Sequence, residues 1–147
     1  MMRDSGSENI EEVASASEAD TLRWAVAFAK RLKPGDTVAL SGNLGAGKTV
    51  VCRGLARGLG FEGDVHSPSY ALVHEYPCSL PLFHMDLYRL TAGADWEEIG
   101  LDHYIQQGGI CLVEWPERLP VEIEFTYRIE ILTEGEELRR IKAICLG

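Results

Sequence analysis

The sequence predicts an α/β protein of three layers, built on a mostly parallel central sheet that ends in antiparallel C-terminal strands. A glycine-rich turn at residues 42–49 lies between a short apolar run and a helical stretch. Two more apolar runs each stop at an acid, as buried parallel strands with ligand groups at their carboxyl ends do. Near the C-terminus, two apolar stretches flank a hairpin-like turn. The length of 147 residues, with 46% hydrophobic and 25% charged residues, fits one domain covering residues 1–147.

The N-terminal part of the chain predicts a loose start followed by a capped helix. About fifteen residues at the start are polar and acidic, and we expect residues 1–15 to be loosely ordered. Ser17 can cap the helix that follows, and Asp20 stands three residues later, as in a variant of the capping box. Apolar residues then recur at helical spacing over 22–29, and Pro34 with Gly35 ends the pattern.

The glycine-rich turn carries the clearest chemical signal. It joins the apolar run 37–40 to the helical stretch 48–59, and it reads G-N-L-G-A-G-K-T, which fits G-x-x-x-x-G-K-[ST] at every fixed position. Such a turn wraps a phosphate with its backbone amides, Lys48 reaches the β and γ phosphates, and Thr49 offers a hydroxyl to Mg²⁺. The turn therefore predicts a P-loop NTPase-like fold with a phosphate site.

Two acids are candidates for the same site. The apolar runs 81–85 and 110–113 stop at Asp86 and Glu114, and we expect both acids at the sheet edge where the glycine turn lies. P-loop sites use a second acid for the metal at the end of a neighbouring strand, which makes Glu114 the first candidate. Asp86 is a candidate for the metal or for orienting the attacking water. The alternative for both acids is that they are only solvated residues at the ends of their strands.

The rest of the chain is less specific. Residues 95–100 and 101–107 predict two short helices, and 124–132 with 138–146 predict two strands of a hairpin. The segment 66–70 has two hydroxyls in a turn, so it is either a switch near a γ phosphate or a plain loop.

Composition excludes several classes of protein. With 14 Lys and Arg against 23 Asp and Glu, the net charge is −9, which argues against direct binding to DNA, tRNA or an anionic membrane. No apolar run approaches the roughly 20 residues that span a bilayer, and no secretory signal is seen, so we expect a cytoplasmic protein. The four cysteines are single and show no ligand spacing with the four histidines, which argues against zinc and disulfides. No N-K-x-D guanine motif is present, which favours ATP.

Five segments in chain order carry a resemblance to a known family. They are G-N-L-G-A-G-K-T at 42–49, S-P-S-Y-A-L-V-H-E-Y at 67–76, H-M-D-L-Y-R-L at 84–90, I-G-L-D-H-Y at 99–104 and L-V-E-W-P-E-R at 112–118. Together they resemble the bacterial TsaE (YjeE) family. The resemblance implies a Mg²⁺-dependent ATPase, weak when alone, that acts with TsaB and TsaD in N6-threonylcarbamoyladenosine modification of tRNA position 37, with tRNA contacted only indirectly.

The resemblance also implies roles for individual residues. The implied nucleotide-binding residues are Gly45, Ala46, Gly47, Lys48, Thr49, Val50, Trp115, Ser69 and, at the start of the first helix, Glu18. Lys48, Asp86 and Glu114 would be catalytic, and Thr49 and Glu114 would hold the metal. From the residues alone, Trp115 either covers a nucleotide or packs in the core.

Two other functions are also compatible with the glycine turn. One is an ATP-operated switch or scaffold with little hydrolysis, which would set the assembly state of a partner. The other is a small P-loop kinase, which only the turn itself favours.

Overall fold

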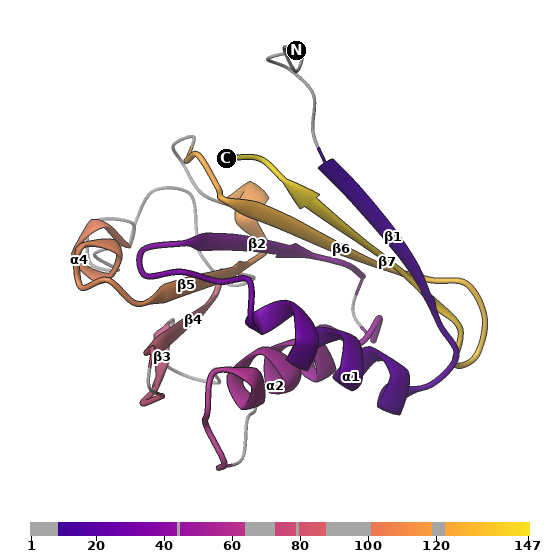
Figure 1. Ribbon diagram of the computed structural model, residues 1–147. Coiled ribbons are helices and arrows are strands. Elements are labelled where there is room, and N and C mark those ends of the chain that lie inside the picture. The colour runs from indigo at the N-terminus through magenta and orange to yellow at the C-terminus, as the bar shows by residue number, and fades with distance from the viewer. Residues whose placement is uncertain (1–8, 44, 64–72, 79, 88–100, 119–122) are drawn as a thin grey trace, which may run out of the picture.

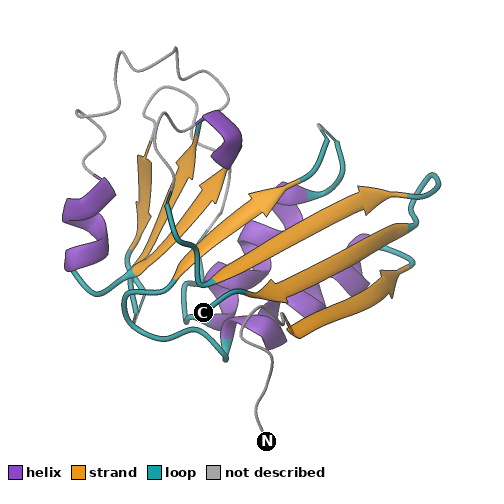
Figure 2. Ribbon diagram, turned by 90° about the horizontal axis from the view of Figure 1, so that it is seen from above, coloured by secondary structure: helices purple, strands orange, loops and turns teal. Residues whose placement is uncertain are grey.

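A seven-stranded sheet crosses the molecule (Figure 2). Its strands lie in the order β1-β7-β6-β2-β5-β4-β3, as labelled in Figure 1. The computed structural model describes residues 9–43, 45–63, 73–78, 80–87, 101–118 and 123–147. The strands are β1 (Asn9–Ser15), β2 (Thr37–Ser41), β3 (Val73–Tyr76), β4 (Leu82–Asp86), β5 (Ile110–Glu114), β6 (Tyr127–Thr133) and β7 (Arg139–Cys145). The middle strands β6, β2, β5 and β4 are parallel, whereas β3 and β7 run antiparallel to their neighbours and β1 is antiparallel to β7. The predicted fold class is confirmed.

Two helices pack together on one face of this sheet (Figure 1). α1 (Glu18–Ala29) begins after Ser17, whose hydroxyl accepts a hydrogen bond from the backbone N–H of Asp20 at 3.1 Å, as the capping pattern predicts. α2 (Lys48–Gly58) approaches α1 closely through Gly54, where a Cβ atom would lie 2.4 Å from the Cβ of Ala25. Gly54 therefore allows the two helices to cross closely.

The opposite face carries α4 (Leu101–Gln106), which supplies the third layer. The ring of Tyr104 lies 4.8 Å from that of Phe83 on β4, measured between centroids, within a second apolar cluster that includes Val113 of β5. A short 3-10 turn, η1 (Pro116–Arg118), follows β5. The helix predicted at 101–107 is confirmed, and the one predicted at 95–100 lies outside the described residues.

The N-terminal expectation was wrong for residues 9–15. They form β1, which pairs with β7 along its whole length. β1 is an edge strand whose acidic side chains make polar contacts. Glu11 accepts a hydrogen bond from the indole of Trp24 at 3.3 Å, and Glu12 forms an ion pair with Arg140 at 3.1 Å. A polar sequence can therefore form this strand, because its stability comes from the ladder and these side-chain contacts and not from an apolar run. β3, a short edge strand, was also not predicted.

Candidate functional site

The glycine turn links the end of β2 to the start of α2, and its backbone conformation depends on glycine. Gly45 and Gly47 have φ values of 82° and 108°, in the left-handed region that favours glycine. At Gly42, a Cβ atom would lie 2.7 Å from the backbone oxygen of Ile131 on β6. The turn is thus shaped by its glycines and lies directly against a neighbouring strand.

Lys48 begins α2 and is buried, with 7% of the residue exposed. Its Nζ lies 4.1 Å from the centroid of the Trp115 ring, a cation–π contact that holds the amine beside the turn. Trp115 follows β5 directly, and its φ of 58° makes it the one non-glycine residue with positive φ within the described ranges. Such a conformation costs about 1–3 kcal/mol and is typical of functional sites, so the backbone is strained where it aims this ring.

The two predicted acids reach the same sheet edge as the turn. Glu114 stands opposite Leu40 of β2 in the strand register, and Asp86 stands opposite Glu114. The N–H of Leu87 donates to the backbone oxygen of Glu114 at 3.1 Å, which continues the β4–β5 pairing past the strand end. The expected position of both acids at the edge of the turn is therefore confirmed.

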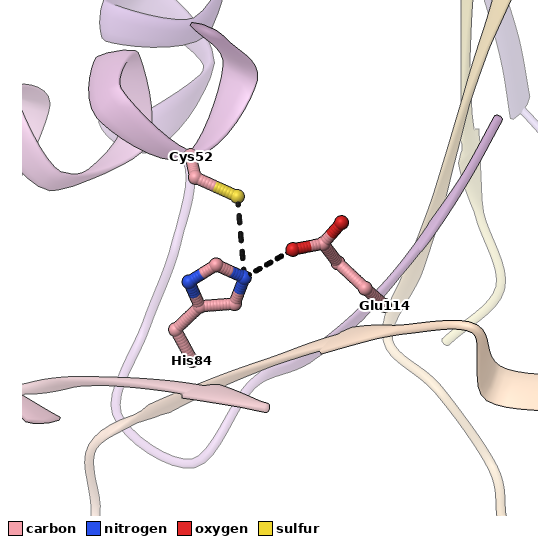
Figure 3. A group of neighbouring side chains, drawn as sticks. All are labelled: Cys52, His84 and Glu114. Carbon is pink, nitrogen blue, oxygen red and sulfur yellow. Dashed lines mark hydrogen bonds and ion pairs between the residues drawn. The ribbon is translucent and has the colours of Figure 1, made fainter. Parts of the chain in front are cut away.

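The carboxylate of Glu114 belongs to a buried cluster of three side chains (Figure 3). The Oε2 atom of Glu114 lies 2.5 Å from Nε2 of His84, and the Sγ atom of Cys52 lies 3.5 Å from the same nitrogen. Cys52 and His84 are fully buried, and Glu114 is 3% exposed. Figure 3 shows the second oxygen of Glu114 pointing away from His84, so the histidine fixes one end of the carboxylate.

Electrostatics around this cluster favour a protonated thiol. Burial raises the pKa of Cys52 well above its ordinary value, and the carboxylates of Glu114 and Asp86 raise it further, while Lys48 lowers it. The site therefore disfavours additional negative charge unless a cation accompanies it.

Arg139 at the start of β7 supports the turn from the other side. Its Nε donates to the backbone oxygen of Ala46 at 2.8 Å, and Nη2 donates to that of Gly45 at 3.4 Å. Nη1 donates to the backbone oxygens of the β6–β7 connection, at Gly135 (3.2 Å), Glu136 (3.3 Å) and Leu138 (2.9 Å). One guanidinium thus ties the glycine turn to the C-terminal hairpin.

Comparison with known proteins identifies the family. A family model described as threonylcarbamoyl adenosine biosynthesis protein TsaE matches residues 15–141. The chain belongs to the TsaE family. It is similar to the tRNA threonylcarbamoyladenosine biosynthesis protein TsaE of Treponema pallidum, with 38% identity over 86% of this chain and 95% of that protein. The Bacillus subtilis protein of the same name is 43% identical over 78% of this chain and 73% of its own length. The crystal structure of Bacillus subtilis YdiB matches with a TM-score of 0.78 and 35% identity, covering 97% of this chain and 90% of that one.

The structure brings together most of the residues that the TsaE resemblance singles out. Lys48, Trp115 and Glu114 gather around the turn, and Thr49, half-buried, follows Lys48 in the first turn of α2. Ala46 and Val50 are buried, whereas Gly45 is exposed. Glu18 is exposed at the start of α1, and Ser69 lies outside the described residues, so the roles of both stay predictions.

Sequence reasoning missed three residues of this TsaE-family site. The cysteines and histidines show no ligand spacing along the sequence, yet Cys52 and His84 meet across 32 positions, a contact that no spacing encodes. Arg139 was missed because its partners are backbone oxygens 93 and 94 positions away. All four cysteines are free thiols, as expected. Within the residues that the structure describes, no helix is both long and apolar enough to cross a membrane.

Proposed function

We propose that this TsaE-family chain is a Mg²⁺-dependent ATPase subunit that acts with TsaB and TsaD in N6-threonylcarbamoyladenosine modification of tRNA. One arrangement carries the proposal. Lys48 lies at the start of α2 and packs on Trp115, and the buried Glu114 ends β5, the strand that pairs with β2. The names of the relatives in Treponema pallidum and Bacillus subtilis support the modification pathway.

The chain's own groups match what a nucleotide triphosphate needs. The amides of the glycine turn and the N-terminus of α2 would bind phosphate oxygens, and the Lys48 ammonium would bind the β and γ phosphates. The indole of Trp115 keeps Lys48 in place before the nucleotide arrives. Lys48 and Trp115 are thus in contact before binding.

The donor set also fits magnesium. Thr49 and Glu114 present a hydroxyl and a carboxylate, the hard oxygen ligands that Mg²⁺ prefers. When bound, Mg²⁺ supplies charge neutralisation at the β and γ phosphate oxygens. The imidazole of His84 holds Oε2 of Glu114 and so orients this carboxylate, and Asp86, next to it in register, is the candidate for orienting the attacking water.

We expect the lone chain to be a slow ATPase. Phosphoryl transfer depends on positioning and charge neutralisation, and a cationic group supplied by a partner can be worth about 10³–10⁵ in rate. TsaB and TsaD would complete the site in this way. The net charge of −9 supports a subunit that docks on protein in the cytoplasm and leaves tRNA to its partners.

The test is phosphate release by the purified chain, alone and with a TsaB–TsaD pair, at one fixed salt concentration. We expect at least a tenfold stimulation by the pair and no salt-sensitive complex of the lone chain with tRNA. A flat, low rate despite tight ATP binding would contradict the ATPase and favour the switch. Phosphate transfer to an added nucleoside faster than to water would favour the kinase.

A further inference from the structure

Cys52, His84 and Glu114 come from α2, β4 and β5 and converge on one point beneath the first turns of α2 (Figure 3). We propose that these three side chains form a binding site for a borderline-soft divalent cation of the Zn²⁺ class. The site is separate in chemistry from the oxygen site proposed for Mg²⁺, although the two share Glu114.

The ligand set is the first argument. Thiolate, imidazole and carboxylate are the groups that bind Zn²⁺, and three protein ligands with one open position are typical of zinc sites that exchange a ligand. The three potential ligand atoms lie within 4.8 Å of one another. All three residues are buried on a helix and two central strands, so the arrangement is held by the core and not by a loop.

Hydrogen bonding is the second argument. Nε2 of His84 has one in-plane position for a proton or a lone pair, yet both Oε2 of Glu114, at 2.5 Å, and Sγ of Cys52, at 3.5 Å, converge on it. One proton cannot serve both neighbours well, whereas a cation between the three atoms contacts all of them. The opposite ring nitrogen, Nδ1, is buried without a hydrogen-bond partner among the described residues.

Protons and charges balance when the cation binds. The thiol proton of Cys52 is released to solvent, and His84 binds as the Nδ1–H tautomer, so that Nε2 offers its lone pair to the cation. The ring stays neutral. The thiolate and the carboxylate of Glu114 then neutralise the two positive charges, as a buried ion requires. The negative charges of Glu114 and of the nearby Asp86 also favour a cation there.

Binding of such a cation has a consequence for the proposed ATPase, and this step rests on the proposed function. Because Glu114 would be held by the cation next to His84 and Cys52, it would be withdrawn from the magnesium of the nucleotide. Zn²⁺ would therefore inhibit Mg²⁺-dependent turnover, and saturating Mg-ATP would weaken Zn²⁺ binding.

The experiment is a Co²⁺ titration of the nucleotide-free full chain under a non-thiol reductant, followed by displacement with Zn²⁺. We expect one equivalent of Co²⁺ with a near-ultraviolet thiolate charge-transfer band and the visible bands of a four-coordinate site. Cys52→Ser should abolish the thiolate band and weaken Zn²⁺ binding by at least about 100-fold, because even supporting residues of metal sites are worth 10–100-fold. Cys78→Ser, which changes a free thiol outside the cluster, should bind as the wild type does.

Absence of the thiolate band in the wild type, or its retention in Cys52→Ser, would overturn the proposal. Should Cys52→Ser fail to fold, the thermal midpoint decides: Zn²⁺ should raise it in the wild type and in Cys78→Ser but not in His84→Gln. An equal rise in His84→Gln would overturn the proposal. None of these measurements uses nucleotide. The metal-site proposal can therefore be overturned without affecting the ATPase proposal, and the ATPase proposal can be overturned without affecting the metal site.

Discussion

The strands on the two sides of β2 make different contacts near the glycine turn (Figure 1). On the β5–β4 side, Glu114 and Asp86 end their strands at the edge where the turn lies, and His84, in the middle of β4, contacts the carboxylate of Glu114. On the β6–β7 side, Ile131 packs against the glycines and Arg139 binds backbone oxygens. In the proposed function, the first half supplies the reacting and ligand groups, and the second half supports the shape of the turn. Substitutions in the two halves should therefore fail in different ways.

Glu114→Gln tests the chemical half and should have the largest effect. The amide still accepts the hydrogen bond from His84, but it removes the charge that a metal-associated acid needs. We expect turnover to fall about 10²–10³-fold, with a much smaller change in ATP affinity. Steady-state kinetics with the TsaB–TsaD pair measures this. Glu117→Gln, an exposed acid three residues on, is the matched control. Turnover close to that of the control would show that Glu114 has no part in the chemistry.

Lys48→Ala removes the charge at the point where the two halves meet. We expect Mg-ATP affinity to drop about 100-fold or more, because charge-assisted hydrogen bonds contribute about 1.5–3 kcal/mol each. Calorimetric titration of the lone chain gives this number. The exposed Lys33→Ala should bind as the wild type does. If both variants bound ATP equally well, the turn would not be a phosphate site.

Gly42→Ala tests the packing of the turn against β6. The added methyl would lie 2.7 Å from the backbone oxygen of Ile131 and 2.8 Å from its Cγ2, so one of the two segments must shift. We expect a loss of about 1–3 kcal/mol in the free energy of unfolding, measured by urea denaturation. An unchanged midpoint would mean that the turn and β6 are not in close contact.

Arg139→Ala tests the shape half at its hydrogen bonds and should have the smallest effect on function. Without the guanidinium, the oxygens of Gly45 and Ala46 lose their donors and the turn becomes less ordered before binding. We expect about a tenfold weaker affinity for Mg-ATP, with turnover at saturating ATP nearly unchanged. The neighbouring Arg140→Ala, which loses only exposed ion pairs with Glu12 and Glu134, should leave both quantities unchanged. A turnover defect at saturating ATP in Arg139→Ala would remove the distinction between the two halves.

What the sequence could predict depends on whether a feature is local or long-range. The glycine turn, the capped first helix and the acids after apolar runs are local signals, because each depends on a few neighbouring residues and a fixed period. The parallel centre of the sheet followed from them. β1 could not be predicted because it is a polar edge strand, stabilised by β7 and by partners such as Arg140. The contacts of Arg139 and of Cys52 with His84 depend on how distant segments meet, and they leave no periodic trace in the sequence.

The most direct test of the central claim is a Mg-ATP titration followed by the fluorescence of Trp115, in a chain where Trp24 and Trp96 are replaced by Phe. Because Lys48 lies on the Trp115 ring beside the turn, phosphate binding must change the surroundings of this indole. We predict a saturable one-site change that is lost in the same background with Lys48→Ala. A signal that stays flat up to millimolar ATP, or an equal response in Lys48→Ala, would contradict a nucleotide site at this turn.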